Sequence, residues 1–158
     1  MDPLADQLGL ELSRKKAFLA VAESCTGGLI AKRITDVAGS SGWFDRGLVV
    51  YSNQAKQDLL GVSPDLLAQF GAVSRECAEA LARGLMVMTP AHWGVAVTGI
   101  AGPGGGSPEK PVGLVWLAWE QRGGKVSSEA LQLSGSREQV RAAAAEAALA
   151  GLLKRLRG

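Results

Sequence analysis

Short apolar runs alternate along the chain with segments whose apolar residues recur at helical spacing, and this alternation constrains the fold more than any other feature. The runs Phe18–Ala22, Gly47–Tyr51 and Trp93–Val97 are typical of buried strands and far too short to cross a bilayer. An amphipathic helix is predicted over residues 3–16, before the first run, and a second helix begins at the glycines after Glu23. Strands that alternate with helices favour an open α/β sheet with helices on both faces.

The last third of the chain predicts a reversal of strand direction. Val112–Trp119 and Val126–Leu133 are strand-like runs joined by a turn at Gly123-Gly124, so we expect an antiparallel pair at an edge of the sheet. The remaining predicted helices are 54–60 with Asn53 as N-cap and Gly61 at its end, 64–70 stopped by Gly71, 74–88 capped by Ser74, and a final one capped by Ser136 with Gln139 as its capping-box partner. No repeat or linker divides the sequence, which predicts one domain over 1–158.

Composition excludes several classes of function. The formal net charge is only +2, without the basic stripe of a nucleic-acid-binding protein. Two cysteines without CxxC spacing and a single histidine are too few ligands for an ordinary zinc site, so we expect no metal. The N-terminus lacks the pattern of a signal peptide. We therefore expect a cytoplasmic protein that binds neither nucleic acid nor membranes.

Three loops follow the predicted parallel strands: Glu23–Gly28, Tyr51–Lys56 and Thr98–Pro111. Each is polar or rich in glycine. In open α/β sheets, ligands bind in the crevice beyond the carboxyl ends of the strands. If the strands lie side by side, these loops meet at one place, which is the predicted site.

The first loop places Ser24 between a strand and a helix. The start of a helix offers unpaired backbone N–H groups that suit an oxyanion or a phosphate. Gly27 and Gly28 would let a ligand approach the backbone closely. An alternative interpretation is that Ser24 and Thr26 only cap the helix.

The second loop supplies Tyr51, Asn53 and Lys56. With Asn53 as N-cap, Lys56 falls in the first helical turn, where the helix dipole and burial would both lower its pKa and make it a usable base. Tyr51, the only tyrosine, could relay a proton or bind the nucleophile. The alternative for an isolated lysine is an exposed side chain without a role.

The third loop resembles a cradle for a phosphate or an oxyanion through Thr98, Gly99, Ala101 and Gly102. It is neither a P-loop nor a Rossmann fingerprint, because GxxxxGK[ST] is absent and no helix follows the glycines. The alternative is a flexible surface loop.

Two arginines and one cysteine are the remaining candidates for substrate binding or catalysis. Arg137 and Arg141 share a face at the start of the last helix, where they could clamp a phosphate or carboxylate or simply face solvent. A Cys25–His92 dyad is disfavoured, because His92 precedes a strand and so lies at the opposite edge of the sheet from the loops.

Taken together, these motifs resemble the CinA C-terminal domain family. The segments that carry the resemblance, in order, are Ala22–Gly28, Tyr51–Lys56, Gly71–Ser74, Thr98–Pro103, Lys110–Gly113, and Gly135 with Arg137. They span nearly the whole chain. The resemblance implies a three-layer α/β/α sandwich with a mostly parallel sheet, and a homo-oligomer.

Members of that family are nicotinamide-nucleotide amidohydrolases. The resemblance implies a serine nucleophile at Ser24 with Lys56 and Tyr51 as partners, no cofactor, and nicotinamide mononucleotide as substrate. Residues expected to bind it are Thr26, Gly27, Gly28, Asn53, Thr98, Gly99, Ala101, Gly102, Arg137 and Arg141. The alternatives are a non-catalytic nucleotide-binding module of the same fold and an amidase for a related small molecule.

Overall fold

A mixed five-stranded sheet, in the order β2-β1-β3-β4-β5, forms the middle of the structure. Its strands are β1 (Leu19–Glu23), β2 (Phe44–Val49), β3 (Trp93–Gly99), β4 (Leu114–Gln121) and β5 (Val126–Gln132). In this computed structural model, which describes residues 1–158, β1 pairs in parallel with β2 and β3, and β4 pairs antiparallel with β3 and β5. The predicted antiparallel edge is confirmed, and the carboxyl ends of β1, β2 and β3 lie at one edge of the sheet.

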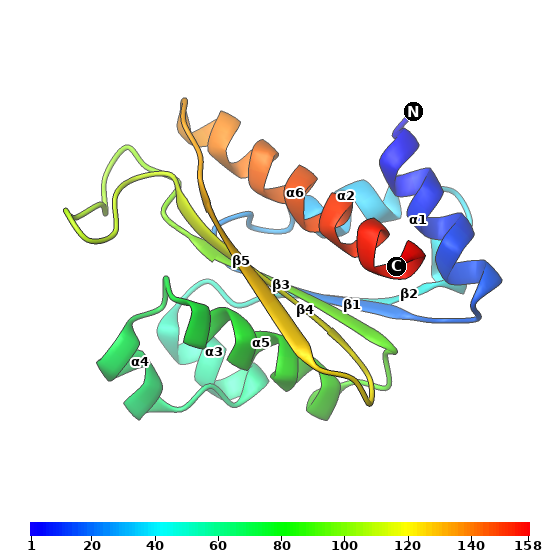
Figure 1. Cartoon of the computed structure of the whole chain (residues 1–158), viewed down its shortest axis with the longest axis horizontal. Helices are drawn as coiled ribbons and strands as arrows, with labels where there is room; N and C mark the ends of the chain where they lie inside the picture. The colour runs from blue at the N-terminus through cyan, green and yellow to red at the C-terminus, as the bar shows by residue number, and fades with distance from the viewer.

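Six α-helices cover the two faces of the sheet. They are α1 (Pro3–Arg14), α2 (Leu29–Thr35), α3 (Asn53–Leu60), α4 (Pro64–Phe70), α5 (Arg75–Met88) and α6 (Arg137–Arg157), with a short 3-10 turn, η1 (Ser40–Gly42), before β2. Figure 1 shows α1, α2 and α6 on one face and α3, α4 and α5 on the other, which confirms the three-layer α/β/α sandwich. None of these helices is both long enough and apolar enough to cross a membrane.

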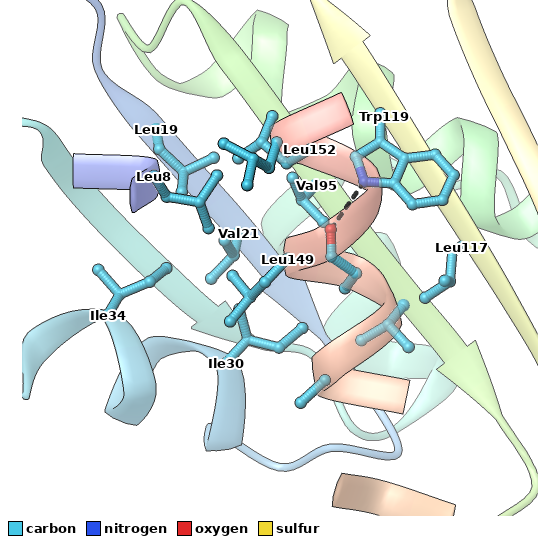
Figure 2. Packing of buried hydrophobic residues seen from close by; sticks show 14 of the residues in the cluster. Leu8, Leu19, Val21, Ile30, Ile34, Val95, Leu117, Trp119, Leu149 and Leu152 are labelled. Atoms are coloured by element: carbon cyan, nitrogen blue, oxygen red, sulfur yellow. Dashed lines mark hydrogen bonds between the residues drawn. The ribbon is translucent and has the colours of Figure 1, made fainter. Parts of the chain in front are cut away.

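Side-chain alternation along the strands divides the core into two unequal halves. In β1, Leu19 and Val21 belong to a cluster of 24 buried residues under α1, α2 and α6, whereas the intervening alanines belong to a cluster of 14 against α3–α5. Figure 2 shows the larger cluster, in which the indole of fully buried Trp119 donates a 3.0 Å hydrogen bond to the carbonyl of Ala148. Gly151 is required there, because a Cβ at this position would lie 2.2 Å from the indole ring.

The predicted second strand is displaced in the structure. The apolar pattern placed it at Gly47–Tyr51, but β2 spans Phe44–Val49 and ends before Tyr51. The polar residues Asp45 and Arg46 belong to β2 because it is an edge strand, in which main-chain pairing to β1 suffices and one side faces solvent. Apolar patterning cannot detect such residues.

The predicted helix caps are confirmed except one. Ser74 and Ser136 cap α5 and α6, the latter with Gln139 in a capping box, and Gly61 and Gly71 end α3 and α4. Asn53, however, is the first residue inside α3, and the N-cap is Ser52, whose hydroxyl accepts a 3.0 Å hydrogen bond from the N–H of Ala55. Serine and asparagine cap about equally well, so propensity alone cannot choose between neighbours.

Candidate functional site

The three predicted loops meet at the carboxyl edge of the parallel strands and enclose a cleft of about 290 Å³. In Figure 1 this is the left-hand end of the molecule, where the β3–β4 loop projects and α6 begins. The cleft is lined by Ser24, Cys25, Tyr51, Asn53, Lys56, Ala72, Val73, Thr98, Gly99, Ile100, Ala101, Gly102, Gly104, Gly105 and Arg137. Main-chain bonds hold the loops together, since the Ser24 N–H donates to the Val97 carbonyl and the Val50 N–H to the Glu23 carbonyl.

A serine and a lysine lie in direct contact in this cleft. The Nζ atom of Lys56 is 3.2 Å from the Oγ atom of Ser24, and it also donates a 3.0 Å hydrogen bond to the backbone carbonyl of Tyr51. Lys56 is 32 positions away from Ser24 in sequence, so the sheet rather than local structure creates the contact. A hydroxyl next to an amine is the arrangement of an activated nucleophile with its base.

Burial changes the chemistry of Lys56. Only 1 % of its surface is exposed, and no carboxylate lies within ion-pair distance of its amine. Burial disfavours the charged ammonium and lowers the pKa of Lys56 below its usual value of 10.5. The direction agrees with the prediction, although desolvation is the main cause and Lys56 is the fourth residue of α3, because Ser52 is the cap.

Glu23 is a residue that supports the first loop of the site, and the sequence analysis did not assign it a role. Its buried carboxylate accepts hydrogen bonds from the Thr26 hydroxyl at 2.6 Å and from the N–H groups of Ile30 and Ala31, both at 2.9 Å. Glu23 therefore caps α2, whose formal N-cap, Gly28, has no side chain for the purpose. The sequence signal that could have indicated this role is the presence of a charged residue at the end of an otherwise apolar strand.

This cap corrects two expectations about the first loop. Neither Ser24 nor Thr26 caps α2, so the alternative interpretation of these residues as simple caps is wrong. The N–H groups of Ile30 and Ala31 are occupied by Glu23, so the helix start is not free to bind a ligand either. The N–H groups without a protein partner belong instead to the turn before the helix, at Cys25, Thr26 and Gly28.

The third loop is tied down at several points. The Thr98 hydroxyl donates to the carbonyl of Ala72 at 2.9 Å, and the N–H of Ile100 donates to the carbonyl of Leu114 at 2.9 Å. The ammonium of Lys110 donates to the Phe70 carbonyl. Gly99 has to be glycine, because a Cβ there would lie 2.7 Å from Val115. Thr98, Gly99, Ala101 and Gly102 all line the cleft, as the prediction of a cradle requires.

Tyr51 reaches the cleft differently from the prediction. It is 59 % exposed, and its hydroxyl accepts a 3.2 Å hydrogen bond from Nη2 of Arg137, whose Nη1 donates to the Gly102 carbonyl at 2.9 Å. The contact of Tyr51 with Lys56 runs through the backbone carbonyl. Its role as a proton relay therefore stays a prediction.

Four of the ten residues predicted to bind the substrate do not line the cleft: Thr26, Gly27, Gly28 and Arg141. Arg141 lies behind the first turn, where Nε donates to the Cys25 carbonyl at 3.0 Å and Nη2 to the Thr26 carbonyl at 3.1 Å. Arg137 and Arg141 thus share a helix but face different partners.

The thiol dyad finds no support in the geometry. Nδ1 of His92 accepts a 2.8 Å hydrogen bond from the N–H of Phe18, at the opposite edge of the sheet from Cys25. Burial raises the pKa of the Cys25 thiol to about 11, so the thiolate nucleophile is disfavoured. No group of three or more His, Cys, Asp or Glu side chains is placed to hold a metal ion.

Comparison with known proteins agrees with this fold. The family model described as CinA C-terminal domain matches residues 1–156. A nicotinamide-nucleotide amidohydrolase PncC from Pseudomonas putida is 54% identical over 157 residues, which cover 98% of each protein. A CinA-like protein from Geobacter sulfurreducens is 52% identical over 98% of this chain but only 38% of its own length. The crystal structure of competence/damage inducible protein CihA from Agrobacterium tumefaciens superposes with a TM-score of 0.95, at 46% identity, over 99% of this chain and 94% of that one.

The matches run over nearly the full length of the chain, and they include the segments that form the cleft. The chain belongs to the CinA C-terminal domain family.

Proposed function

We propose that this protein hydrolyses the carboxamide of nicotinamide mononucleotide to give nicotinate mononucleotide and ammonia. The observation that carries the proposal is the buried contact between the Ser24 hydroxyl and the Lys56 amine, 3.2 Å apart in the cleft. Relatives of similar length at about half identity, such as the Pseudomonas putida protein, are named nicotinamide-nucleotide amidohydrolases, which supports this substrate.

The chemistry begins with neutral Lys56 accepting the proton of the Ser24 hydroxyl. Oγ attacks the carboxamide carbon, and the resulting oxyanion is held by the unpaired N–H group of Cys25, in the turn after Ser24, or by that of Ala101, both of which line the cleft. The Lys56 ammonium then returns its proton to the departing nitrogen, the C–N bond breaks, and ammonia leaves an acyl-enzyme at Ser24. Water attacks this ester while Lys56 again takes the proton. The C–O bond to Ser24 breaks, Lys56 returns the proton to Oγ of Ser24, and the acid product loses its remaining proton to solvent as the carboxylate.

The experiment that tests the proposal is a product assay with nicotinamide mononucleotide, nicotinamide riboside and free nicotinamide. We expect ammonia and nicotinate mononucleotide in equal amounts from the first substrate. Binding of the nucleotide in calorimetry without ammonia release would favour a non-catalytic binding module, and faster turnover of one of the other two amides would favour an amidase for a related small molecule.

The activity should rise with pH. Only the neutral amine of Lys56 can accept the Ser24 proton, and burial lowers the pKa of Lys56 below 10.5. The neutral fraction, and with it kcat/KM, therefore increases as the pH rises through the folded-state pKa and levels off above it. A profile of kcat/KM from about pH 6 to about pH 10, with circular dichroism to verify folding at each pH, measures this. A flat or falling profile would contradict a lysine base.

Arg137 is proposed to bind the phosphate of the substrate. It lines the cleft, its side chain is exposed, and no carboxylate pairs with its guanidinium. Arg137→Ala should raise KM by roughly 10- to 100-fold, as expected for a charge-assisted hydrogen bond, with a smaller effect on kcat. An unchanged KM would remove Arg137 from the binding residues. Lys32→Met, which removes an exposed charge paired with Asp36 on α2, is the control.

We also propose that residues 1–158 act as one domain, in the cytoplasm, and as a homo-oligomer. The two core clusters are built from helices and strands along the whole chain, which supports a single folding unit. Both cysteines are free and buried, which fits a reducing compartment. Light scattering of the purified protein tests the oligomeric state.

A further inference from the structure

Arg141 is the charged side chain that holds the backbone carbonyls of the turn containing the nucleophile. Both of its hydrogen bonds go to backbone carbonyls of that turn, to Cys25 and to Thr26, and none goes to a carboxylate. The turn is closed from inside by the Gly27 N–H, which donates to the Ser24 carbonyl at 3.1 Å. Arg141 is partly buried and does not line the cleft.

The planarity of the peptide bond links these contacts to the cleft. In a trans peptide the C=O and the N–H point in opposite directions. Because the Ser24 carbonyl is bonded to Gly27, the N–H of Cys25 points away from the interior of the turn. Because the Cys25 carbonyl is bonded to Arg141, the N–H of Thr26 points away from Arg141. Neither N–H has a partner within the protein, and of the two residues only Cys25 lines the cleft.

We propose that Arg141 is a positioning residue that holds the turn after Ser24 in the conformation needed to bind the oxyanion, and not a ligand of the substrate. The inference rests on the proposed amide hydrolysis. An oxyanion donor is effective only when it is fixed before the reaction begins, and the bidentate guanidinium fixes two successive peptides with a single side chain. The position of Gly27 supports this, because φ is +59° and a Cβ there would lie 3.0 Å from Nη2 of Arg141.

The proposal separates the two arginines of α6 by their kinetic effects. Loss of Arg141 should lower kcat by roughly 10²-fold, the cost expected when catalytic groups shift by about 1 Å, with KM little changed. Arg141→Lys should retain intermediate activity, because an ammonium keeps the charge but cannot bind both carbonyls in a planar fork. Gly27→Ala should lower kcat in the same way, since it disturbs the same contact from the turn.

The experiment measures kcat, KM and Tm for Arg141→Gln, Arg141→Lys and Gly27→Ala with nicotinamide mononucleotide, and the rate of 4-nitrophenyl acetate hydrolysis in parallel. Arg122→Gln is the matched control. That guanidinium also donates to backbone carbonyls, those of Met86, Thr89 and Ala91, but at the other end of the sheet. It should lower Tm without lowering kcat.

Two outcomes overturn the inference. A raised KM with unchanged kcat in Arg141→Gln would make Arg141 a substrate ligand. Equal losses of kcat in Arg141→Gln and Arg122→Gln, in proportion to Tm, would make it merely structural. If the unaltered protein releases no ammonia from nicotinamide mononucleotide but hydrolyses the ester, the proposed function fails and the ester rates test Arg141 alone. If it hydrolyses neither substrate, both proposals fail.

Discussion

Replacement of Ser24 by alanine is expected to lower kcat for ammonia release by about 10⁴-fold or more, as for removal of the nucleophile from other acyl-transfer enzymes. The physical reason is that Ser24 Oγ is the nucleophile in contact with the buried amine of Lys56. Since Ser24 is only 7 % exposed and alanine fits the same space, Tm should change little. Stopped-time assays of ammonia at saturating nicotinamide mononucleotide measure the loss.

The adjacent cysteine provides the control for this experiment. Cys25→Ala removes a thiol whose pKa is raised to about 11 by burial and retains the backbone N–H. Its activity should stay near that of the unaltered protein. Near-normal kcat in Ser24→Ala, or inactivation by Cys25→Ala, would show that Ser24 is not the nucleophile. Mass spectrometry of protein treated with a slow acylating ester should locate the adduct at Ser24.

Replacement of Lys56 by methionine should lower kcat without lowering the free energy of unfolding. Loss of a general base typically costs about 10²- to 10⁴-fold in rate, so kcat should fall in that range. Stability should not fall with it, because methionine has a similar volume and removes the cost of burying an amine that has no carboxylate partner. We therefore expect an inactive protein whose free energy of unfolding is equal to or higher than that of the unaltered chain.

A second variant shows which property of Lys56 matters. Arg is always protonated in proteins, so Lys56→Arg keeps a cation but abolishes the base, and it should be as inactive as Lys56→Met. Appreciable activity in Lys56→Arg would show that the charge, not proton transfer, is what the site requires. The measurements are kcat and urea-induced unfolding of both variants.

The strands and helices of this fold were largely readable in the chain, because apolar spacing and caps are local signals. The run before Glu23, the capping box at Ser136 and Gln139, and the glycine turn before β5 all predicted elements that the structure contains. The edge strand β2 was displaced because pairing with β1, not burial, defines it. The N-cap of α3 was predicted as Asn53 but is Ser52. The prediction failed because serine and asparagine cap helices almost equally well, so sequence preference does not distinguish two neighbours.

The candidate site was predictable only as a set of loops. Parallel strands bring their carboxyl ends together, so sequence order alone placed Ser24 and Lys56 at the same edge of the sheet. The group that each side chain contacts was not predictable, because the contact depends on the direction in which the side chain leaves its helix or loop. Arg137 enters the cleft and Arg141 turns behind it, although both lie on the same helix four residues apart. Glu23 caps α2 from the end of β1.

The sequence by itself determined the α/β architecture and the edge of the sheet where chemistry is possible, since spacing, caps and glycine turns act over a few residues. Tertiary structure decided which groups touch: the 3.2 Å contact of Lys56 with Ser24, the burial that lowers the pKa of the lysine, and the clamp of Arg141 on the nucleophile turn. Distances between side chains and exclusion of water depend on the packing of whole helices against the sheet, which no local pattern records.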